Sequence, residues 1–168
     1  TEDLFPRLEI EDLGYQLAAY GQRSYNGVAI LSKRPLHDVV VGLPDFPDEQ
    51  ARYIEAVIPS EGGVVRVASL YTPNGNPADS EKFDYKLRWL AALRARAEAL
   101  LEFEEPLVLG GDYNVIPTPL DVYDPEACVT DALFRIETRS AFRSVVNLGL
   151  TDAVRACHSA PQLYTFWD

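Results

Sequence analysis

Two polar side chains that can do acid-base or metal chemistry follow a short apolar run. Leu107-Val108-Leu109 leads into Gly110-Gly111, and Asp112 and Asn114 come next, on either side of Tyr113. The apolar run predicts a buried strand, and alternation along an extended chain would place Asp112 and Asn114 on one face. The glycines leave room for a backbone or a phosphate to approach. The alternative is a β-turn in which the two side chains only cap the loop.

A second polar loop follows the apolar run from Val64 to Tyr71. Its sequence, Tyr71-Thr72-Pro73-Asn74, carries a phenol and a carboxamide away from the end of a predicted strand. Functional residues of α/β proteins are concentrated on such loops. A proline-initiated turn with a half-buried Tyr71 is the alternative.

A third polar loop runs from Gly21 to Gly27 and precedes the apolar run Val28 to Leu31. Its Arg23, Tyr25 and Asn26 offer a charge, an aromatic ring and an amide, which can bind phosphate or stack on a base. Asn26-Gly27 is also an ordinary turn pair, so a simple turn is the competing interpretation.

Composition limits the class of protein. The chain has 168 residues, of which 47% are hydrophobic, which indicates one globular domain. Its net charge of −11 argues against a surface that coats nucleic acid, although a metal ion can offset carboxylates at a phosphate site. Two cysteines and two histidines indicate neither a disulfide framework nor a zinc site. With no membrane-length apolar run and no signal-peptide pattern at Thr1-Glu2-Asp3-Leu4, we expect a cytoplasmic protein.

Periodicity predicts the elements that must position these loops. A short helix is expected within 5–14, strands at 15–20 and 28–31, and a hairpin from 53–58 and 64–71. Apolar residues spaced by three and four predict an amphipathic helix over 81–101, with Lys82, Lys86 and several arginines on its polar side. A strand at 107–109 and a helix at 138–148 complete the prediction.

Seven motifs occur in an order that resembles one family. They are Phe5-Pro6, Tyr25-Asn26-Gly27-Val28-Ala29-Ile30-Leu31-Ser32-Lys33, Leu70-Tyr71-Thr72-Pro73-Asn74-Gly75, Lys82-Phe83-Asp84-Tyr85-Lys86, Gly111-Asp112-Tyr113-Asn114-Val115, Asn147-Leu148-Gly149-Leu150-Thr151-Asp152 and Tyr164-Thr165-Phe166-Trp167-Asp168. Together they resemble exodeoxyribonuclease III and the apurinic/apyrimidinic endonucleases of the endonuclease/exonuclease/phosphatase superfamily. The resemblance implies an α/β (α+β) fold: part of a four-layer α-β-β-α sandwich whose two sheets are antiparallel or mixed.

The resemblance also implies a metal-dependent DNA phosphodiester hydrolase, a 3′-5′ exonuclease and abasic-site endonuclease of DNA repair. It uses Mg²⁺ or Mn²⁺ and acts on double-stranded DNA. By this resemblance Tyr71, Asp112 and Asn114 are catalytic, Asp112 and Asn114 also bind the metal, and the residues that bind substrate are Asn74, Tyr25, Asn26, Phe166 and Trp167. Extrusion of an abasic nucleotide into a pocket walled by Phe166 and Trp167 is physically cheap.

The resemblance covers only the middle of the family's pattern. Residues 1–168 are expected to form a single nuclease-type domain that lacks strands at both ends of the full fold, together with a metal-binding glutamate and a histidine. We therefore expect the 168-residue chain alone to cleave little DNA, and to self-associate through exposed sheet edges. Another phosphoesterase of the superfamily and a non-catalytic fragment remain the alternatives.

Overall fold

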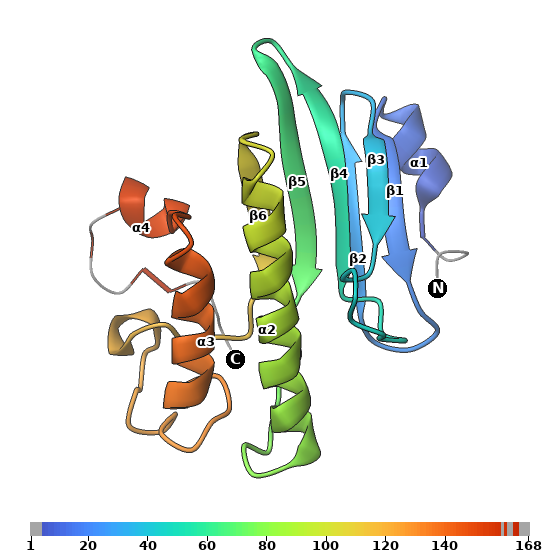
Figure 1. The fold of residues 1–168 in the computed structure, drawn as a ribbon. Helices are drawn as coiled ribbons and strands as arrows, with labels where there is room; N and C mark the ends of the chain where they lie inside the picture. Colours follow the sequence, from blue (N-terminus) through green and yellow to red (C-terminus); the bar gives the residue numbers. More distant parts are fainter. Residues whose placement is uncertain (1–4, 159, 161–162, 165–168) are drawn as a thin grey trace. The chain divides into compact units, whose positions relative to one another are not determined.

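The computed structural model describes residues 5–158, 160 and 163–164 and divides the chain into two compact units (Figure 1). The first unit comprises residues 1–72 and 98–113, and the second comprises residues 73–97 and 114–168. The expectation of one nuclease-type domain over residues 1–168 stays a prediction. Among the described residues, no helix is both long and apolar enough to cross a membrane.

Two β-sheets build the first unit. The strands are β1 (Gln16–Gly21), β2 (Gly27–Ser32), β3 (His37–Val41), β4 (Tyr53–Ser60), β5 (Gly63–Tyr71) and β6 (Leu107–Asp112). Strands β1 and β2 pair antiparallel, while the larger sheet has the order β3-β4-β5-β6, with an antiparallel hairpin from β4 and β5 and parallel pairing of β5 with β6. This combination of an antiparallel sheet, a mixed sheet and helices confirms the predicted fold class.

An apolar core lies between the two sheets of the first unit, where β2 contacts β4 and β5. Ile30 of β2 and Ile54 and Ala56 of β4 are its buried members. Because side chains alternate along a strand, Ile54 and Ala56 lie on one face of β4. The partly buried residues packed around them are Ala18, Tyr20, Val28, Leu36 and Ile58. This core fixes the small sheet on the large one.

Helix α1 (Arg7–Asp12) precedes β1 and contacts it. The helix ends where the sequence predicts, because Gly14 has a φ of 78°, in the left-handed region that favours glycine after a helix. The predicted strands at 15–20 and 28–31 and the hairpin from 53–58 and 64–71 are also confirmed, with ends that differ from the prediction by one or two residues.

Two features of the larger sheet differ from the sequence prediction. Strand β3 was not predicted from the sequence. Most of its residues are exposed, so its sequence needs no alternation of apolar and polar residues. Its register with β4 also shifts between His37 and Val40. The strand predicted at 107–109 is confirmed as β6, but its predicted burial was wrong, because Val108 is 50% exposed and β6 is at one edge of the sheet within the described residues. A run of three apolar residues does not show whether one or both faces of a strand are covered.

The second unit is built from helices and long loops. Helix α2 (Glu81–Leu101) has most of its length in this unit, followed by the 3-10 helix η2 (Pro119–Asp121), α3 (Ile136–Val146) and α4 (Ala153–Cys157). Helix α3 confirms the predicted helix at 138–148. Thr118 and Asp121 form a capping box at η2, and Asp152 caps α4 by accepting a hydrogen bond from the Arg155 N–H.

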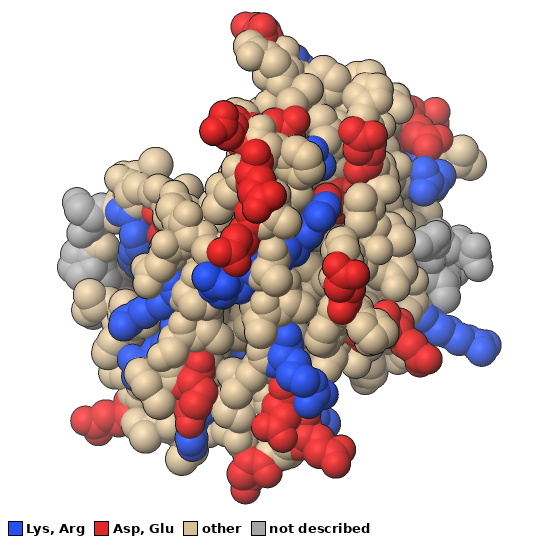
Figure 2. Space-filling model, viewed as in Figure 1, with Lys and Arg blue, Asp and Glu red and all other residues tan. Residues whose placement is uncertain are grey.

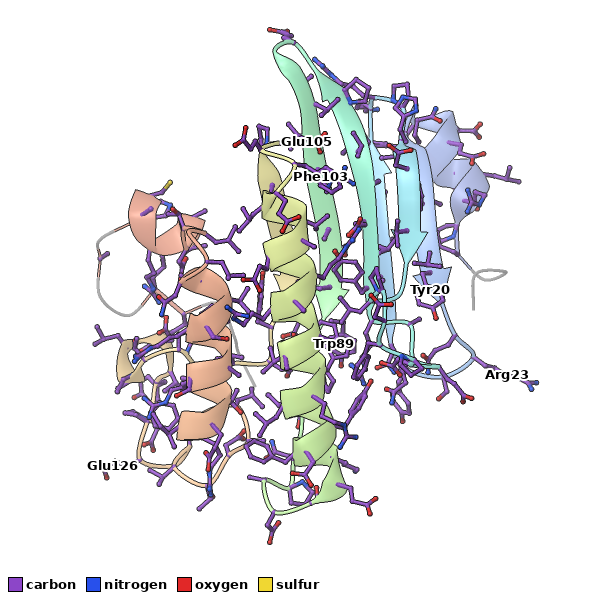
Figure 3. The ribbon with its side chains drawn as sticks, in the orientation of Figure 1. Tyr20, Arg23, Trp89, Phe103, Glu105 and Glu126 are labelled. Atoms are coloured by element: carbon purple, nitrogen blue, oxygen red, sulfur yellow. The ribbon has the colours of Figure 1, made fainter. Side chains whose placement is uncertain are left out.

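The buried side of α2 is confirmed with one correction. Five residues of the predicted apolar stripe are buried and its Leu87 is half-buried; the five are Phe83, Leu90, Leu93, Ala97 and Leu100. Trp89, labelled in Figure 3, is also buried, although it was not part of the predicted stripe. Lys86, predicted on the polar side, is fully buried. Its position explains this, because it lies three residues after Phe83 and four before Leu90, within the buried stripe.

Candidate active site

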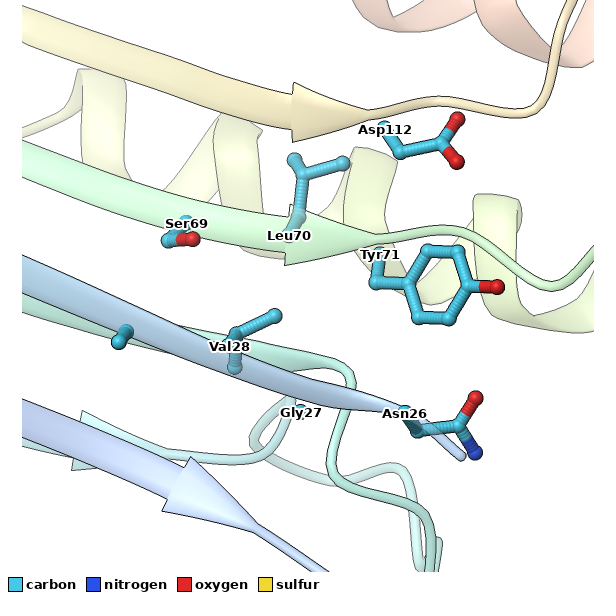
Figure 4. Close-up of a pocket in the computed structure, with 8 residues that line it drawn as sticks. Asn26, Gly27, Val28, Ser69, Leu70, Tyr71 and Asp112 are labelled. Carbon is cyan, nitrogen blue, oxygen red and sulfur yellow. The ribbon is translucent and has the colours of Figure 1, made fainter. Parts of the chain in front are cut away.

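The ends of β5 and β6 and the start of β2 line an open pocket in the first unit. Its volume is about 450 Å³, and its lining residues are Asn26, Gly27, Val28, Ala29, Ser69, Leu70, Tyr71 and Asp112. Figure 4 shows the Asp112 carboxylate, the Tyr71 phenol and the Asn26 carboxamide projecting past the strand ends in the same direction. Three residues predicted from three separate loops therefore line one pocket.

Parallel pairing brings Tyr71 and Asp112 together. The C-terminal ends of parallel strands lie at the same edge of a sheet, and Tyr71 is the register partner of Asp112. Just beyond β5, the Thr72 N–H donates to the Asp112 carbonyl oxygen at 2.8 Å. The backbone on both sides of the pocket is thus held by the sheet itself.

Of the two glycines before Asp112, Gly111 is the one that permits close approach. Its φ is 140°, and a Cβ atom there would overlap backbone atoms of Leu70 on the neighbouring strand. At Gly110 the nearest atom to such a Cβ would be the Ala68 carbonyl oxygen, 3.9 Å away, which is an ordinary contact. The missing side chain at Gly111 therefore makes room for the Leu70 backbone and does not leave an empty space.

A hydrogen-bonded network links Asn26 to Tyr71 through two residues that the sequence analysis did not single out. The Gln50 Oε1 atom accepts hydrogen bonds from Asn26 Nδ2 at 3.0 Å and from Arg52 Nε and Nη2 at 3.0 and 2.7 Å. Arg52 Nη1 donates to the Tyr71 carbonyl oxygen at 3.1 Å, and its guanidinium lies 5.0 Å from the centre of the Tyr71 ring. These hydrogen bonds hold the Asn26 side chain and the Tyr71 backbone in place beside the pocket.

The predicted hairpin offered a signal that could have found Arg52. Tyr53 pairs with Leu70, so the preceding residue, Arg52, lies opposite Tyr71, and the Tyr71 N–H donates to the Arg52 carbonyl oxygen at 2.8 Å. An arginine opposite an aromatic residue at the end of a hairpin can stack on the ring.

The predicted amides Asn74 and Asn114 meet in the second unit. Asn74 Nδ2 donates to Asn114 Oδ1 at 3.4 Å; Asn74 is exposed, whereas Asn114 is only 8% exposed. Strand β6 ends at Asp112, and Asn114 has a φ of 46°. The alternation that would have placed Asp112 and Asn114 on one face therefore does not extend to Asn114.

The other predicted substrate-binding residues do not line the pocket or are not described. Tyr25, with a φ of 48°, is 90% exposed and does not line the pocket. Arg23 of the same loop extends outward (Figure 3). Phe166 and Trp167 lie outside the described residues, as does most of the predicted aromatic run at the C-terminal end.

The side chains that line the pocket suit a cation that binds through few protein groups. Asp112 supplies a carboxylate there, and the described residues contain no group of three or more His, Cys, Asp or Glu side chains that could hold a metal ion. Mg²⁺ commonly binds through one or two carboxylates and keeps several waters, so Asp112 with water and phosphate oxygens fits it. Figure 2 shows acidic and basic side chains mixed over one face of the molecule.

Comparison with known proteins identifies the family. The Endonuclease/Exonuclease/phosphatase family matches residues 3–167. The chain belongs to this family. Its curated relatives include exodeoxyribonuclease III from Haemophilus influenzae, 33% identical over 124 residues that cover 73% of this chain and 46% of the relative. An exodeoxyribonuclease from Bacillus subtilis is 32% identical and covers 87% of this chain and 56% of the relative.

Solved structures agree with this assignment. The 3′-5′ exonuclease NExo from Neisseria meningitidis has a TM-score of 0.93 and 39% identity, over 99% of this chain and 64% of that one. An AP endonuclease from Archaeoglobus fulgidus has a TM-score of 0.91 and 35% identity, over 99% of this chain and 63% of that one. The resemblance to exodeoxyribonuclease III and the AP endonucleases is thus confirmed. The chain spans about half the length of these curated relatives.

Proposed function

We propose that the chain carries the catalytic pocket of a DNA phosphodiester hydrolase of the exodeoxyribonuclease III type, with 3′-5′ exonuclease and abasic-site endonuclease activity. The observation that supports this is the pocket shared by Asn26, Tyr71 and Asp112 in a chain of this family. A carboxylate can activate a water molecule, and a phenol and an amide can donate to phosphoryl oxygens, so the three groups can support hydrolysis of a phosphodiester.

Each side chain has a role in this proposal. The Asp112 carboxylate orients an attacking water and accepts its proton. The Tyr71 phenol O–H and an Asn26 amide N–H donate to phosphoryl oxygens, whose negative charge increases in the transition state. As the family resemblance implies, Asn74 contributes an amide that contacts phosphate, and Asn114 contributes an amide that holds the same site together. The Gln50 and Arg52 network holds Asn26 and Tyr71 in place.

Metal dependence is also part of the proposal. Mg²⁺ or Mn²⁺, when bound, supplies positive charge that stabilises the phosphoryl oxygens. Asp112 would hold the ion, with Asn114 as the second ligand that the resemblance implies.

Double-stranded DNA with an abasic site is the proposed substrate. The Neisseria 3′ phosphatase NExo has been solved bound to a product DNA hairpin, and the Archaeoglobus relative is an AP endonuclease. Phe166 and Trp167 remain the proposed walls of the pocket for an extruded abasic sugar. The expected cytoplasmic location likewise stays a prediction.

A cleavage assay on a chimera tests the proposal. Residues 1–168 replace the matching part of the Neisseria exonuclease, and the chimera is incubated with Mg²⁺ and a labelled duplex that carries one abasic-site analogue or a recessed 3′ end. We expect cleavage, and we expect Asp112→Asn to lower its single-turnover rate by about 10²–10⁴-fold. Asp12→Asn, at an exposed position in α1, is the matched control and should leave the rate unchanged.

Other outcomes would contradict the proposal. A folded chimera that cleaves no DNA would exclude the assigned chemistry. An Asp112→Asn variant that cleaves as fast as the parent chimera would exclude it as well. Hydrolysis of an inositol phosphate in place of DNA would favour the other phosphoesterases of the superfamily. The 168-residue chain is assayed in parallel and is expected to cleave little; strong cleavage by it, abolished in Asp112→Ala, would contradict only that expectation.

A further inference from the structure

Lys86 is a fully buried cation that the proposed chemistry does not use. It lies on α2, in the second unit, and its side chain has no exposed surface. Removing an ammonium group from water is costly unless hydrogen bonds replace its hydration. A buried lysine therefore needs hydrogen-bond acceptors around its ammonium group.

The Lys86 ammonium bridges two loops of the second unit. Lys86 Nζ donates to the Asn74 carbonyl oxygen at 2.9 Å and to the Asn114 carbonyl oxygen at 2.5 Å. In the sequence Asn74 follows strand β5 and Asn114 follows strand β6, so the cation ties together the loops that leave these two strands. Hydrogen bonds from a charged donor are roughly twice as strong as those between neutral groups.

The two residues bound through their backbones have separate roles by the family resemblance: Asn74 binds substrate, and Asn114 is catalytic and binds the metal. Their side chains are themselves hydrogen-bonded to each other, from Asn74 Nδ2 to Asn114 Oδ1 at 3.4 Å. The loop around Asn74 is further restrained, because the Asn76 N–H donates to Asn74 Oδ1 at 3.1 Å and Asn76 Nδ2 donates to Asp131 Oδ1 at 3.0 Å. Lys86 thus binds the backbones of two residues whose side-chain amides are hydrogen-bonded to each other and to the rest of the Asn74 loop.

The space around the Lys86 stem is closely filled. Gly75, with a φ of 87°, lies against it, and a Cβ atom at Gly75 would be 2.6 Å from Lys86 Cδ. A side chain at position 75 would therefore displace the Lys86 stem, so this position favours glycine.

We infer that Lys86 is a positioning residue, which fixes the backbones of Asn74 and Asn114 so that their amide side chains are held in one geometry. The effect on cleavage rests on the proposed function, whereas the effect on the two amides does not. Because Lys86 is fully buried, it acts through these two residues rather than by touching the substrate. Displacement of a catalytic group by about 1 Å can lower a rate by about 10²-fold.

Replacement of the ammonium group tests this role. Lys86→Met keeps the length of the side chain and removes its charge and donors, and Lys82→Met, at an exposed position of the same helix, is the matched control. In the 168-residue chain we expect the side-chain amide NMR signals of Asn74 and Asn114 to shift in Lys86→Met and to stay in place in Lys82→Met. In the chimera we expect the single-turnover rate of DNA cleavage to fall by about 10²-fold, with KM changed less than about twofold.

Chemical rescue tests whether the ammonium group itself is what the two loops require. In a background of Cys128→Ser and Cys157→Ser, Lys86→Cys is alkylated under denaturing conditions with 2-bromoethylamine, which rebuilds an ammonium of nearly the same length, and is then refolded. This product should recover the wild-type amide signals and rate. If Lys86→Met does not fold, Lys86→Gln is measured instead.

Two results would overturn the inference. One is a folded variant at position 86 whose Asn74 and Asn114 signals match the wild type. The other is a loss of rate accompanied only by a lower melting temperature, with no recovery after aminoethylation. If the parent chimera cleaves no DNA, the proposed function fails, and the amide signals still decide the role of Lys86.

Discussion

Tyr71 and Asp112 are register partners at the ends of the parallel strands β5 and β6, and the Thr72 N–H donates to the Asp112 carbonyl oxygen at 2.8 Å. The whole of helix α2 lies between these two residues in the sequence. Their proximity is therefore a product of strand pairing, and changes that disturb this pairing should disturb the pocket even when they touch neither side chain.

Gly111→Ala should weaken the pairing of β5 with β6. Its φ of 140° is strained for alanine, and the added Cβ would overlap the Leu70 backbone. We expect the free energy of unfolding to fall by about 3 kcal/mol or more. Gly110→Ala is the matched control, with an expected change below about 1 kcal/mol, because its Cβ meets only an ordinary contact. Urea denaturation measures both, and equal effects would refute the assigned role of Gly111.

Arg52→Met should loosen Tyr71 and Asn26 together. The substitution removes the hydrogen bonds to Gln50 and to the Tyr71 carbonyl oxygen and the charge over the Tyr71 ring. We expect a loss of about 1–3 kcal/mol in the free energy of unfolding and a lower cleavage rate in the chimera. Arg88→Met, at an exposed position of α2, serves as the control. Unchanged stability and rate in Arg52→Met would show that the network is not needed.

The thiol of Cys128 should react slowly at mildly alkaline pH. Burial raises its pKa, and the nearby carboxylates of Asp131 and Asp124 raise it further. Because the folded pKa lies above that of the unfolded chain, this group favours folding at low pH, and its contribution is lost as the pH rises through the folded pKa. Both cysteines are free thiols, so Cys157→Ser isolates Cys128.

Alkylation of this variant by iodoacetamide between pH 7 and pH 10 measures the effect. We expect the rate of the folded protein to rise at higher pH than the rate of the same protein in denaturant. Asp124→Asn should move the folded curve part of the way back. Coincident curves for folded and denatured protein would contradict the assigned environment.

Self-association through sheet edges is expected of the 168-residue chain. Strand β6 is at one edge of the described part of the larger sheet, and its Val108 is 50% exposed. An open apolar edge strand favours pairing with another copy. Sedimentation velocity at several concentrations should show species larger than the monomer, fewer in Val108→Lys. A monodisperse monomer at all concentrations would be evidence against this interface.

Local patterns in the sequence predicted most of the elements correctly. The helix stop at Gly14, the hairpin of β4 and β5 and the buried stripe of α2 depend on residues near one another in the chain, so periodicity and turn residues are enough to find them. Strand β3 was missed because an exposed edge strand needs no alternation. Lys86 was misplaced because its charge was given more weight than its position in the stripe.

The sequence by itself determined the family, most of the helices and strands, and the residue types that carry the proposed chemistry, Asn26, Tyr71 and Asp112 among them. Only the tertiary structure decided that these three line one pocket, that Gln50 and Arg52 join two of them, and that Lys86 binds the backbones of Asn74 and Asn114. The physical reason is that these contacts join residues far apart in the chain. Strand register and burial create them, and local sequence patterns do not encode either.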